Sequence, residues 1–272
     1  MEQKLSKKTR TESDLIGSRE VPESALYGVQ TLRGIENFRI SKFHLNEYPL
    51  FIQALAITKM GAAVANRELE LLTEEQTDAI LKACKEILEG KHHDQFPVDM
   101  IQGGAGTTTN MNANEVIANR ALELMGHARG EYQYCSPNDH VNRSQSTNDA
   151  YPTAIHIGLY YTHLKLVKHF ATLIEAFRKK GAEFAHIIKM GRTQLEDAVP
   201  MTLGQTFNGF ASILEHELKN LDFAAQDFLT VNMGATAIGT GITAEPEYAE
   251  KCIAALRKIT GLDIKLADDL TY

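Results

Sequence analysis

The sequence predicts a mainly α protein, in which a mostly helical N-terminal domain is followed by part of a long-helix bundle. After Pro152 no proline occurs up to residue 188, and apolar side chains recur there at spacings of three, four and seven residues, as on one face of a helix. A second stripe with this spacing begins at Leu203 and ends at Phe228. Helices this long need partners along their whole length, so a long-helix bundle is the expected architecture.

The first half of the chain predicts shorter helices joined by loops. Residues 1–48 carry the glycine and proline punctuation of turns and short extended pieces. Helical patterning then covers residues 49–70. Thr73 and Gln76 have the spacing of a capping box, which predicts a helix over residues 74–90.

A loop and a third helix follow. Residues 91–106 predict a loop. Asn112 and Glu115 form a second pair with capping-box spacing, and they predict a helix that begins there and ends near Gly126.

The second half of the chain predicts longer helices. Residues 152–188 are expected to be one helix, with Pro152 in its first turn, where proline is tolerated. Residues 200–231 predict its near-antiparallel neighbour. A glycine-rich link over residues 234–241 leads to a further helix over residues 245–261.

Length and charge narrow the class of protein. The 272 residues are enough for two domains, which we place at 1–145 and 146–272. A net charge of −7 argues against a general nucleic-acid or membrane-surface partner, and no apolar run is long enough to span a membrane. The basic residues at positions 4–10 are not followed by the apolar segment of a secretory signal, and three cysteines are too few for a disulfide framework. We therefore expect a cytoplasmic protein with reduced thiols.

Three short polar segments carry the candidate chemistry. They are GGAGTTTN at residues 103–110, QSTND at residues 145–149 and GRTQ at residues 191–194, each dense in hydroxyls and amides and each followed by a predicted helix. Helix starts present unpaired N–H groups and a positive dipole end, which suit carboxylates and phosphates. Together the three segments predict a pocket for a small, multiply anionic substrate.

Each segment also has a plainer interpretation. The first is compatible with a glycine loop and an ordinary helix cap, and it is no phosphate-binding P-loop because no Gly-Lys-Ser/Thr follows it. The second is compatible with a helix cap, and the third with a polar loop. His216-Glu217 begins like a zinc-protease motif, but position 220 is Asn instead of His. We therefore predict no metal site, and Cys135 is only a weak candidate nucleophile.

The three segments are part of a longer series of motifs that resembles the aspartase/fumarase superfamily, and its aspartase branch most closely. Two positions favour aspartase: fumarases carry His where Gln194 follows Thr193, and usually His where Ser136 precedes Pro137. The matching motifs cover essentially the whole chain and lie, in order, at residues 12–17, 21–22, 27–31, 36–38, 96–99, 103–115, 145–149, 191–205 and 234–241.

The resemblance implies a reaction and roles for particular residues. The reaction is the elimination of ammonia from L-aspartate to give fumarate, without a cofactor. Thr107, Ser146 and Thr147 would bind the reacting carboxylate. Asn148 would bind the amino group, with Gln194 nearby, and Thr193 would bind the other carboxylate. In this superfamily each site is assembled from three subunits of a homotetramer.

One departure from the superfamily stands out. Its members have a Gly-Ser-Ser loop that supplies the serine base, and no Ser-Ser pair occurs in this sequence. We therefore expect an N-terminal fragment that holds no catalytic base and is inactive alone. A fumarate hydratase of the same superfamily and a non-catalytic structural protein remain the alternatives.

Overall fold

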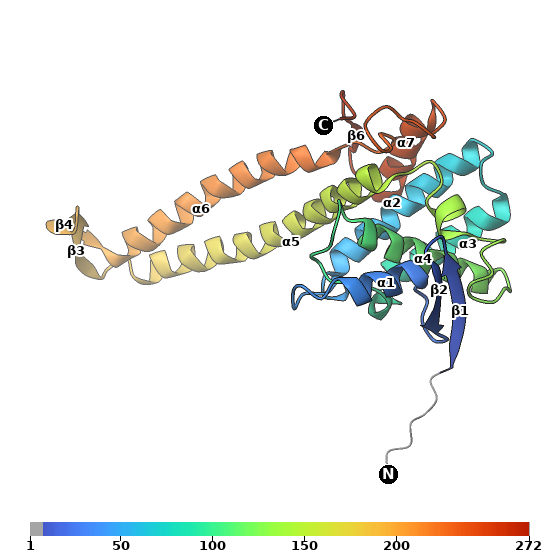
Figure 1. Ribbon diagram of the computed structural model, residues 1–272. Helices are drawn as coiled ribbons and strands as arrows, with labels where there is room; N and C mark the ends of the chain where they lie inside the picture. The colour runs from blue at the N-terminus through green and yellow to red at the C-terminus, as the bar shows by residue number, and fades with distance from the viewer. Residues whose placement is uncertain (1–7, 272) are drawn as a thin grey trace, which may run out of the picture. The chain divides into compact units, whose positions relative to one another are not determined.

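The computed structural model describes residues 8–271, which form two compact units (Figure 1). Within the described range, the first contains residues 8–158 and 229–271, and the second contains Leu159–Phe228. Most of the regular structure is helical, which confirms the mainly α prediction. The basic residues at positions 4 and 7 lie outside the described residues. The division into domains at residue 145 stays a prediction.

The first unit begins with a hairpin and a short helix. Strands β1 (Thr9–Asp14) and β2 (Gly17–Pro22) pair antiparallel, in keeping with the short extended pieces predicted there. Helix α1 (Val29–Asn37) is absent from the predicted elements. Its own N-cap residue, Gly28, has no capping side chain.

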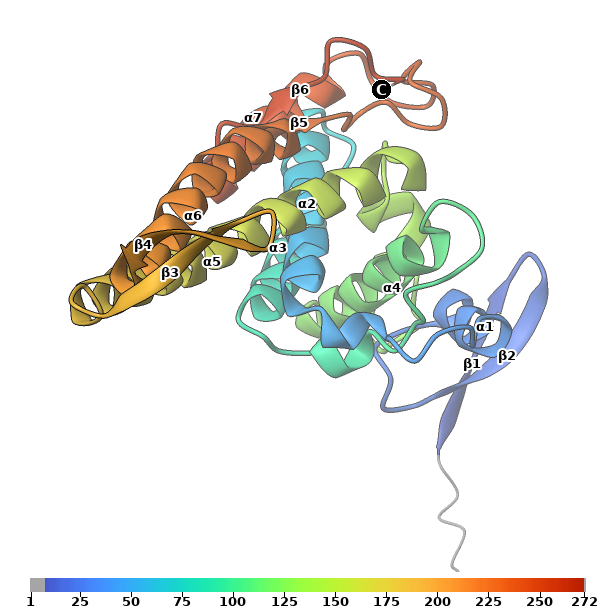
Figure 2. The same cartoon turned by 90° about the vertical axis from the view of Figure 1, so that its left-hand side faces the viewer.

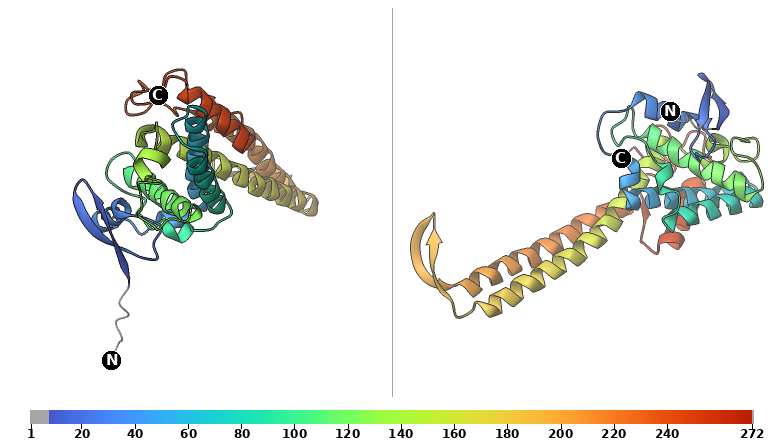
Figure 3. Two further views of the ribbon diagram at one scale, coloured as in Figure 1. Left: turned by 90° about the vertical axis from the view of Figure 1, so that its right-hand side faces the viewer. Right: turned by 90° about the horizontal axis from the view of Figure 1, so that it is seen from below.

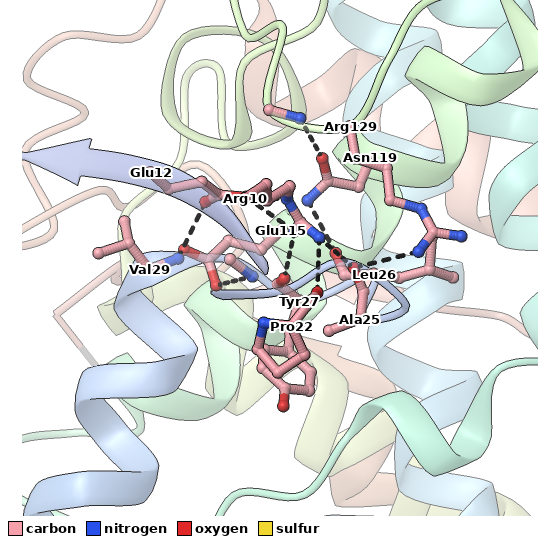
Figure 4. Close-up of polar contacts among 12 residues, drawn as sticks. Arg10, Glu12, Pro22, Ala25, Leu26, Tyr27, Val29, Glu115, Asn119 and Arg129 are labelled. Carbon is pink, nitrogen blue, oxygen red and sulfur yellow. Dashed lines mark hydrogen bonds and ion pairs between the residues drawn. The ribbon is translucent and has the colours of Figure 1, made fainter. Parts of the chain in front are cut away.

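Distant carboxylates cap α1 instead (Figure 4). Glu115 accepts hydrogen bonds from the N–H groups of Gly28 (2.8 Å), Gln30 (2.8 Å) and Thr31 (3.0 Å). Glu12 accepts from Val29 N–H at 3.0 Å and is paired with Arg10. Unpaired N–H groups at a helix start favour negative charge. A helix capped from so far along the chain leaves no local signal in the sequence.

Helices α2 (Pro49–Glu68), α3 (Glu74–Leu88) and α7 (Tyr248–Thr260) build much of the core of this unit. The predicted capping box at the start of α3 is present. Helix α2 contacts both α3 and α7 (Figure 1). At Gly61 an added Cβ would lie 2.6 Å from the side chain of Leu256 on α7, so only glycine permits this close approach of the two helices.

Helix α4 (Thr107–Leu124) begins five residues before Asn112, so the predicted start at Asn112 is wrong. Gly106 is its N-cap, with a φ of +84° that favours glycine. A Cβ on Gly106 would also collide with the ring of Tyr151. The presumed capping pair of Asn112 and Glu115 is buried inside the helix, where Glu115 caps α1.

Shorter elements complete the first unit. A π-helix spans Pro137–Val141, and short 3-10 helices span Leu45–Glu47 and His93–Gln95. Strands β5 (Thr230–Val231) and β6 (Lys265–Leu266) form a small parallel pair next to α7 (Figure 2).

Helix α5 (Thr147–Glu183) begins in the first unit and continues into the second. It starts five residues before Pro152 and ends five residues before Ile188, so both predicted ends are corrected. Pro152 lies inside the helix, where it has no N–H to donate to the carbonyl of Asn148 four residues earlier. That carbonyl accepts a hydrogen bond from Asn232 Nδ2 at 3.3 Å instead.

Within the second unit, α5 and α6 (Leu203–Ala225) lie side by side in opposite directions, as predicted (Figure 3). Arg178 forms an ion pair with Glu215 (2.8 Å), and His163 contacts Asp222 (2.9 Å). Rings from the two helices and from the residue that directly follows α5 pack together: Phe177, Phe184, Phe207 and Phe210.

A β-hairpin joins these two helices. Strands β3 (Ile188–Thr193) and β4 (Glu196–Thr202) pair antiparallel (Figure 2). Pro200 therefore lies in a strand, and the predicted helix over residues 200–231 is correct only between Leu203 and Ala225. The actual start of α6 has its own capping box, formed by Thr202 and Gln205. No helix among the described residues is long and apolar enough to cross a membrane.

Candidate functional site

Two helix starts meet in the first unit. Asn110, in the first turn of α4, donates a hydrogen bond from Nδ2 to Thr147 Oγ1 at the start of α5, over 3.2 Å. Gly106 lies against the ring of Tyr151, so the same two helix ends also touch on a second side. Both positive dipole ends therefore act on the same small region.

Four of the predicted site residues lie at these two helix starts. Thr107 is the first residue of α4 and is exposed. Ser146 and Thr147 are half-buried, and Asn148 is exposed. Ser146 Oγ accepts a hydrogen bond from Asn148 N–H at 3.3 Å. The region thus offers hydroxyls and an amide to a ligand, at the positive ends of two helices.

Asp149 connects the start of α5 to the glycine-rich segment of residues 234–241. One carboxylate oxygen accepts from Ser146 N–H (2.9 Å), and the other accepts from the N–H groups of Gly234 (3.1 Å) and Thr236 (3.0 Å). Burial raises the pKa of Asp149, and these hydrogen bonds act against that shift. These hydrogen bonds of Asp149 hold backbone in place, so its carboxylate has a structural role.

A hollow of about 310 Å³ lies beside Asn148. Asn148 Nδ2 donates to the carbonyl of Ala237 at 2.9 Å, so its amide oxygen is directed away from that carbonyl. The hydroxyl of Thr236 is buried and has no hydrogen-bond partner among the described residues. The wall of the hollow consists of Asn148, Asn232, residues 235–239, Leu270 and Thr271.

Lys59 on α2 lies behind the meeting point of the two helices and is fully buried. Its ammonium donates to Asn110 Oδ1 (2.7 Å), Asn142 Oδ1 (3.0 Å) and Gln145 Oε1 (2.8 Å). Burial lowers the pKa of Lys59 to about 7, while the negative charge of Asp149 acts in the opposite direction.

Thr193 and Gln194 belong to the second unit. Thr193 ends β3, and Gln194 is the first of two turn residues, both fully outside the core. Gln194 and Leu195 have φ of +49° and +69°, as in the two-residue turn typical of hairpins. The prediction that residues 191–194 directly precede a helix is therefore wrong, and the anion-binding argument from a helix start does not apply to them.

The weak candidate Cys135 and two other polar side chains, Ser136 and Arg33, take structural positions. Cys135 is buried, and burial raises the pKa of its thiol to about 12, so it is no nucleophile at neutral pH. Ser136 caps the π-helix and contacts Asp139. Arg33 pairs with Asp14 at 2.8 Å. Among residues 8–271, no group of three or more His, Cys, Asp or Glu side chains is placed to hold a metal ion.

Sequence reasoning missed two residues that support the helix starts, namely Lys59 and Asn142, and it gave Asp149 of the 145–149 segment no separate role. Lys59 had a detectable signal, because it stands in a run of small and apolar residues over 54–65. A lysine in a helix that is buried on most of its faces must itself be buried and find acceptors. Asn142 gave no such signal.

The chain matches the family model described as lyase over residues 17–271. It belongs to the lyase family. Aspartate ammonia-lyase of Pseudomonas fluorescens is 56% identical over 262 residues, which are 96% of this chain and 55% of that protein. Aspartate ammonia-lyase of Escherichia coli K12 is 52% identical over 267 residues, 98% of this chain and 56% of that protein. The chain thus spans about half the length of these lyase relatives.

Solved structures of the lyase family have the same fold. A fumarate lyase:delta crystallin from Brucella melitensis, bound to cobalt, superposes with a TM-score of 0.92 at 50% identity. The match covers 97% of this chain and 57% of that chain. A class II fumarase from Schistosoma mansoni gives a TM-score of 0.88 at 33% identity. The match covers 97% of this chain and 58% of the fumarase chain. The resemblance stated from the motifs is confirmed.

Proposed function

We propose that this chain forms part of an aspartate ammonia-lyase, which reversibly eliminates ammonia from L-aspartate to give fumarate. The observation that carries the proposal is the meeting of two helix starts with Thr107, Ser146, Thr147 and Asn148 at their ends. The relatives named aspartate ammonia-lyase, at 51% to 56% identity, support this choice.

The reacting carboxylate belongs at these helix starts. Removing a proton from the carbon beside it creates a carbanion, whose charge spreads into the carboxylate as a dianion. Hydroxyl and N–H donors that bind the dianion better than the ground state lower the barrier. Thr107, Ser146 and Thr147 supply the hydroxyls, and the first turns of α4 and α5 supply N–H groups and positive potential.

Asn148 is the proposed ligand of the amino group. Because its Nδ2 donates to Ala237, its amide oxygen remains to accept a hydrogen bond from the substrate ammonium. In this proposal Gln194 lies near the same group, and Thr193 binds the second carboxylate. The residues of one complete site come from three subunits of a homotetramer.

The proposed reaction needs no cofactor, and the protein works in the cytoplasm. The serine base and further carboxylate ligands come from a Gly-Ser-Ser loop, which this sequence does not contain. Fumarate hydratase is the second candidate, supported by the fold shared with the Schistosoma fumarase. Gln194 and Ser136, together with the higher identity to aspartate ammonia-lyases, favour the first.

The test compares this chain alone with a completed chain. The completed chain is this sequence followed by the segment of the Escherichia coli relative that lies beyond the matched region. We expect the completed chain to release fumarate from L-aspartate, followed by the ultraviolet absorbance of fumarate, and the 272-residue chain alone to release none. Turnover by the chain alone would refute the assignment of the base, and an inactive but folded completed chain would refute the proposed function.

A further inference from the structure

The contacts of Lys59 fix the orientation of several amides at once. An ammonium group has donors and no acceptor. Each amide that contacts Lys59 Nζ must therefore present its oxygen, as Asn110, Asn142 and Gln145 do at 2.7–3.0 Å. The NH₂ ends of Asn110 and Gln145 then point away from the lysine.

The amide of Asn110 carries this orientation to the helix start. Its Nδ2 donates to Asn142 Oδ1 (3.1 Å) and to Thr147 Oγ1 (3.2 Å). An amide nitrogen is only a donor, so Thr147 Oγ1 must accept in this contact. The hydroxyl hydrogen of Thr147 is thereby directed elsewhere and is free to be donated to a ligand.

Gln145 holds the other side of the same region. Its Nε2 donates to the carbonyls of Val141 (2.9 Å) and Arg143 (3.1 Å), so the segment that leads into Ser146 is tied to the lysine. Through Asn110 and Gln145, the ammonium group of Lys59 thus acts on two neighbouring hydroxyl donors, those of Thr147 and Ser146.

We propose that Lys59 is a positioning residue of this site, which orients the amide of Asn110 so that Thr147 keeps its hydroxyl hydrogen for the ligand carboxylate. The inference rests on the proposed function in taking the ligand to be a dicarboxylate. Lys59 does not touch the substrate and acts only through Asn110 and Gln145.

A purely structural role explains the lysine poorly. Among the described residues, no carboxylate lies within ion-pair distance of Nζ, and an ammonium without such a partner is costly to bury. A methionine would fill similar space without that cost. The titratable groups that face the ammonium are Asp149 at the start of α5, Cys84 on α3 and Cys252 on α7. Burial lowers the pKa of Lys59 because it penalises the charged form of the lysine.

A double-mutant cycle in the completed chain tests the coupling. We expect Lys59→Met to lower kcat for L-aspartate about 10- to 100-fold, the range for a misplaced group in an active site. In a Thr147→Ala background the same change should cost about twofold or less, because the group it positions is gone. An equal fold-loss in both backgrounds would overturn the proposal.

Thr58→Val is the matched control. Thr58 is the buried neighbour of Lys59 on α2, and its hydroxyl donates a hydrogen bond to the carbonyl of Ala54 at 2.9 Å. We expect any effect of Thr58→Val on kcat to be the same with Thr147 present or absent. A change as non-additive as that of Lys59→Met would show that the cycle reports general loosening of α2, and would overturn the proposal.

A second measurement does not depend on activity, so its failure is distinguishable from a failure of the proposed function. In ¹⁵N spectra of the 272-residue chain, the side-chain amide signals of Asn110 and Gln145 should move together as pH passes through the titration of Lys59. These movements should vanish in Lys59→Met and persist in Thr58→Val. Signals that do not respond to Lys59 would overturn the proposal even if the completed chain is fully active.

Discussion

Asn110 Nδ2 lies 3.2 Å from Thr147 Oγ1, and this hydrogen bond joins the first turns of two helices whose starting residues are forty positions apart. It makes the threonine oxygen an acceptor and leaves its hydrogen for a ligand. We expect Thr147→Ala in the completed chain to lower kcat for L-aspartate by about 10²- to 10³-fold, the usual loss for one oxyanion donor. Steady-state rates measure this directly.

Thr172→Ala is the control for that substitution. Thr172 lies on the same helix, is exposed, and its hydroxyl contacts the carbonyl of Lys168. Its removal should leave kcat within about twofold of the original, as for a surface change remote from the site. A Thr147→Ala enzyme with an unchanged rate would remove Thr147 from the site.

The stability of the chain should rise with pH because of Lys59. The pKa of this lysine is about 7 in the folded state, against 10.5 for a model lysine. Between these values the unfolded chain binds more protons, so raising the pH favours folding. From about pH 6.5 to about pH 8.5 the free energy of unfolding should gain about 2 kcal/mol from this group.

Urea unfolding of the original chain and of Lys59→Met measures this contribution. Other titrating groups cancel in the difference between the two proteins. The difference should favour the original chain progressively as pH rises. A difference that is independent of pH would show that Lys59 keeps an ordinary pKa in the folded protein.

The elements that sequence predicted well carry their own local signals. Thr73 and Gln76 cap α3 with the expected geometry, because both members of a capping box lie within four residues of each other. The start of α1 depends on Glu115, 87 positions from Gly28, and no local pattern marks such a cap. The four donors at the starts of α4 and α5 were predicted from their residue types, whereas the contacts of Lys59 with Asn110, Asn142 and Gln145 required the fold.

The β3–β4 hairpin shows why the third polar segment was misjudged. Its two turn residues, Gln194 and Leu195, have positive φ. Hairpin turns of this kind usually contain Asn or Gly, and this one contains neither. Pro200 then resembled a helix start, although it lies in β4. Because the turn lacks the usual residues, the strands on both sides of it were not predicted.

That strain predicts a stabilising substitution. Leu195 has a φ of +69° and is 94% exposed, so it bears a backbone cost without gaining burial. Leu195→Asn should stabilise the hairpin by about 1 kcal/mol, because asparagine tolerates left-handed backbone better. Hydrogen exchange of the β3 and β4 amides measures the effect.

Val199→Asn is the matched control for the hairpin. Val199 is also exposed, at 65%, but it does not have a positive φ. It should leave exchange unchanged or faster, since asparagine is a poor strand residue. Equal protection in both variants would contradict the assignment of strain to Leu195.

The second unit should drive self-association. Two antiparallel helices leave large apolar side chains open to solvent, among them Leu173, Ile213 and, at 81% exposure, Phe223. Patches of this kind mark interaction surfaces. We expect the 272-residue chain to be oligomeric in analytical ultracentrifugation, and the triple change of these residues to Glu to shift it toward monomer. A monomeric original chain would contradict the proposed assembly.

The ratio of aspartate to malate turnover tests the central claim most directly. We propose that the chain is part of an aspartate ammonia-lyase, with Gln194 and Ser136 standing where fumarases carry histidine. In the completed chain, kcat/KM for L-aspartate should exceed kcat/KM for L-malate, with fumarate release as the common readout. A larger kcat/KM for L-malate would contradict the account and assign the chain to the fumarate hydratases.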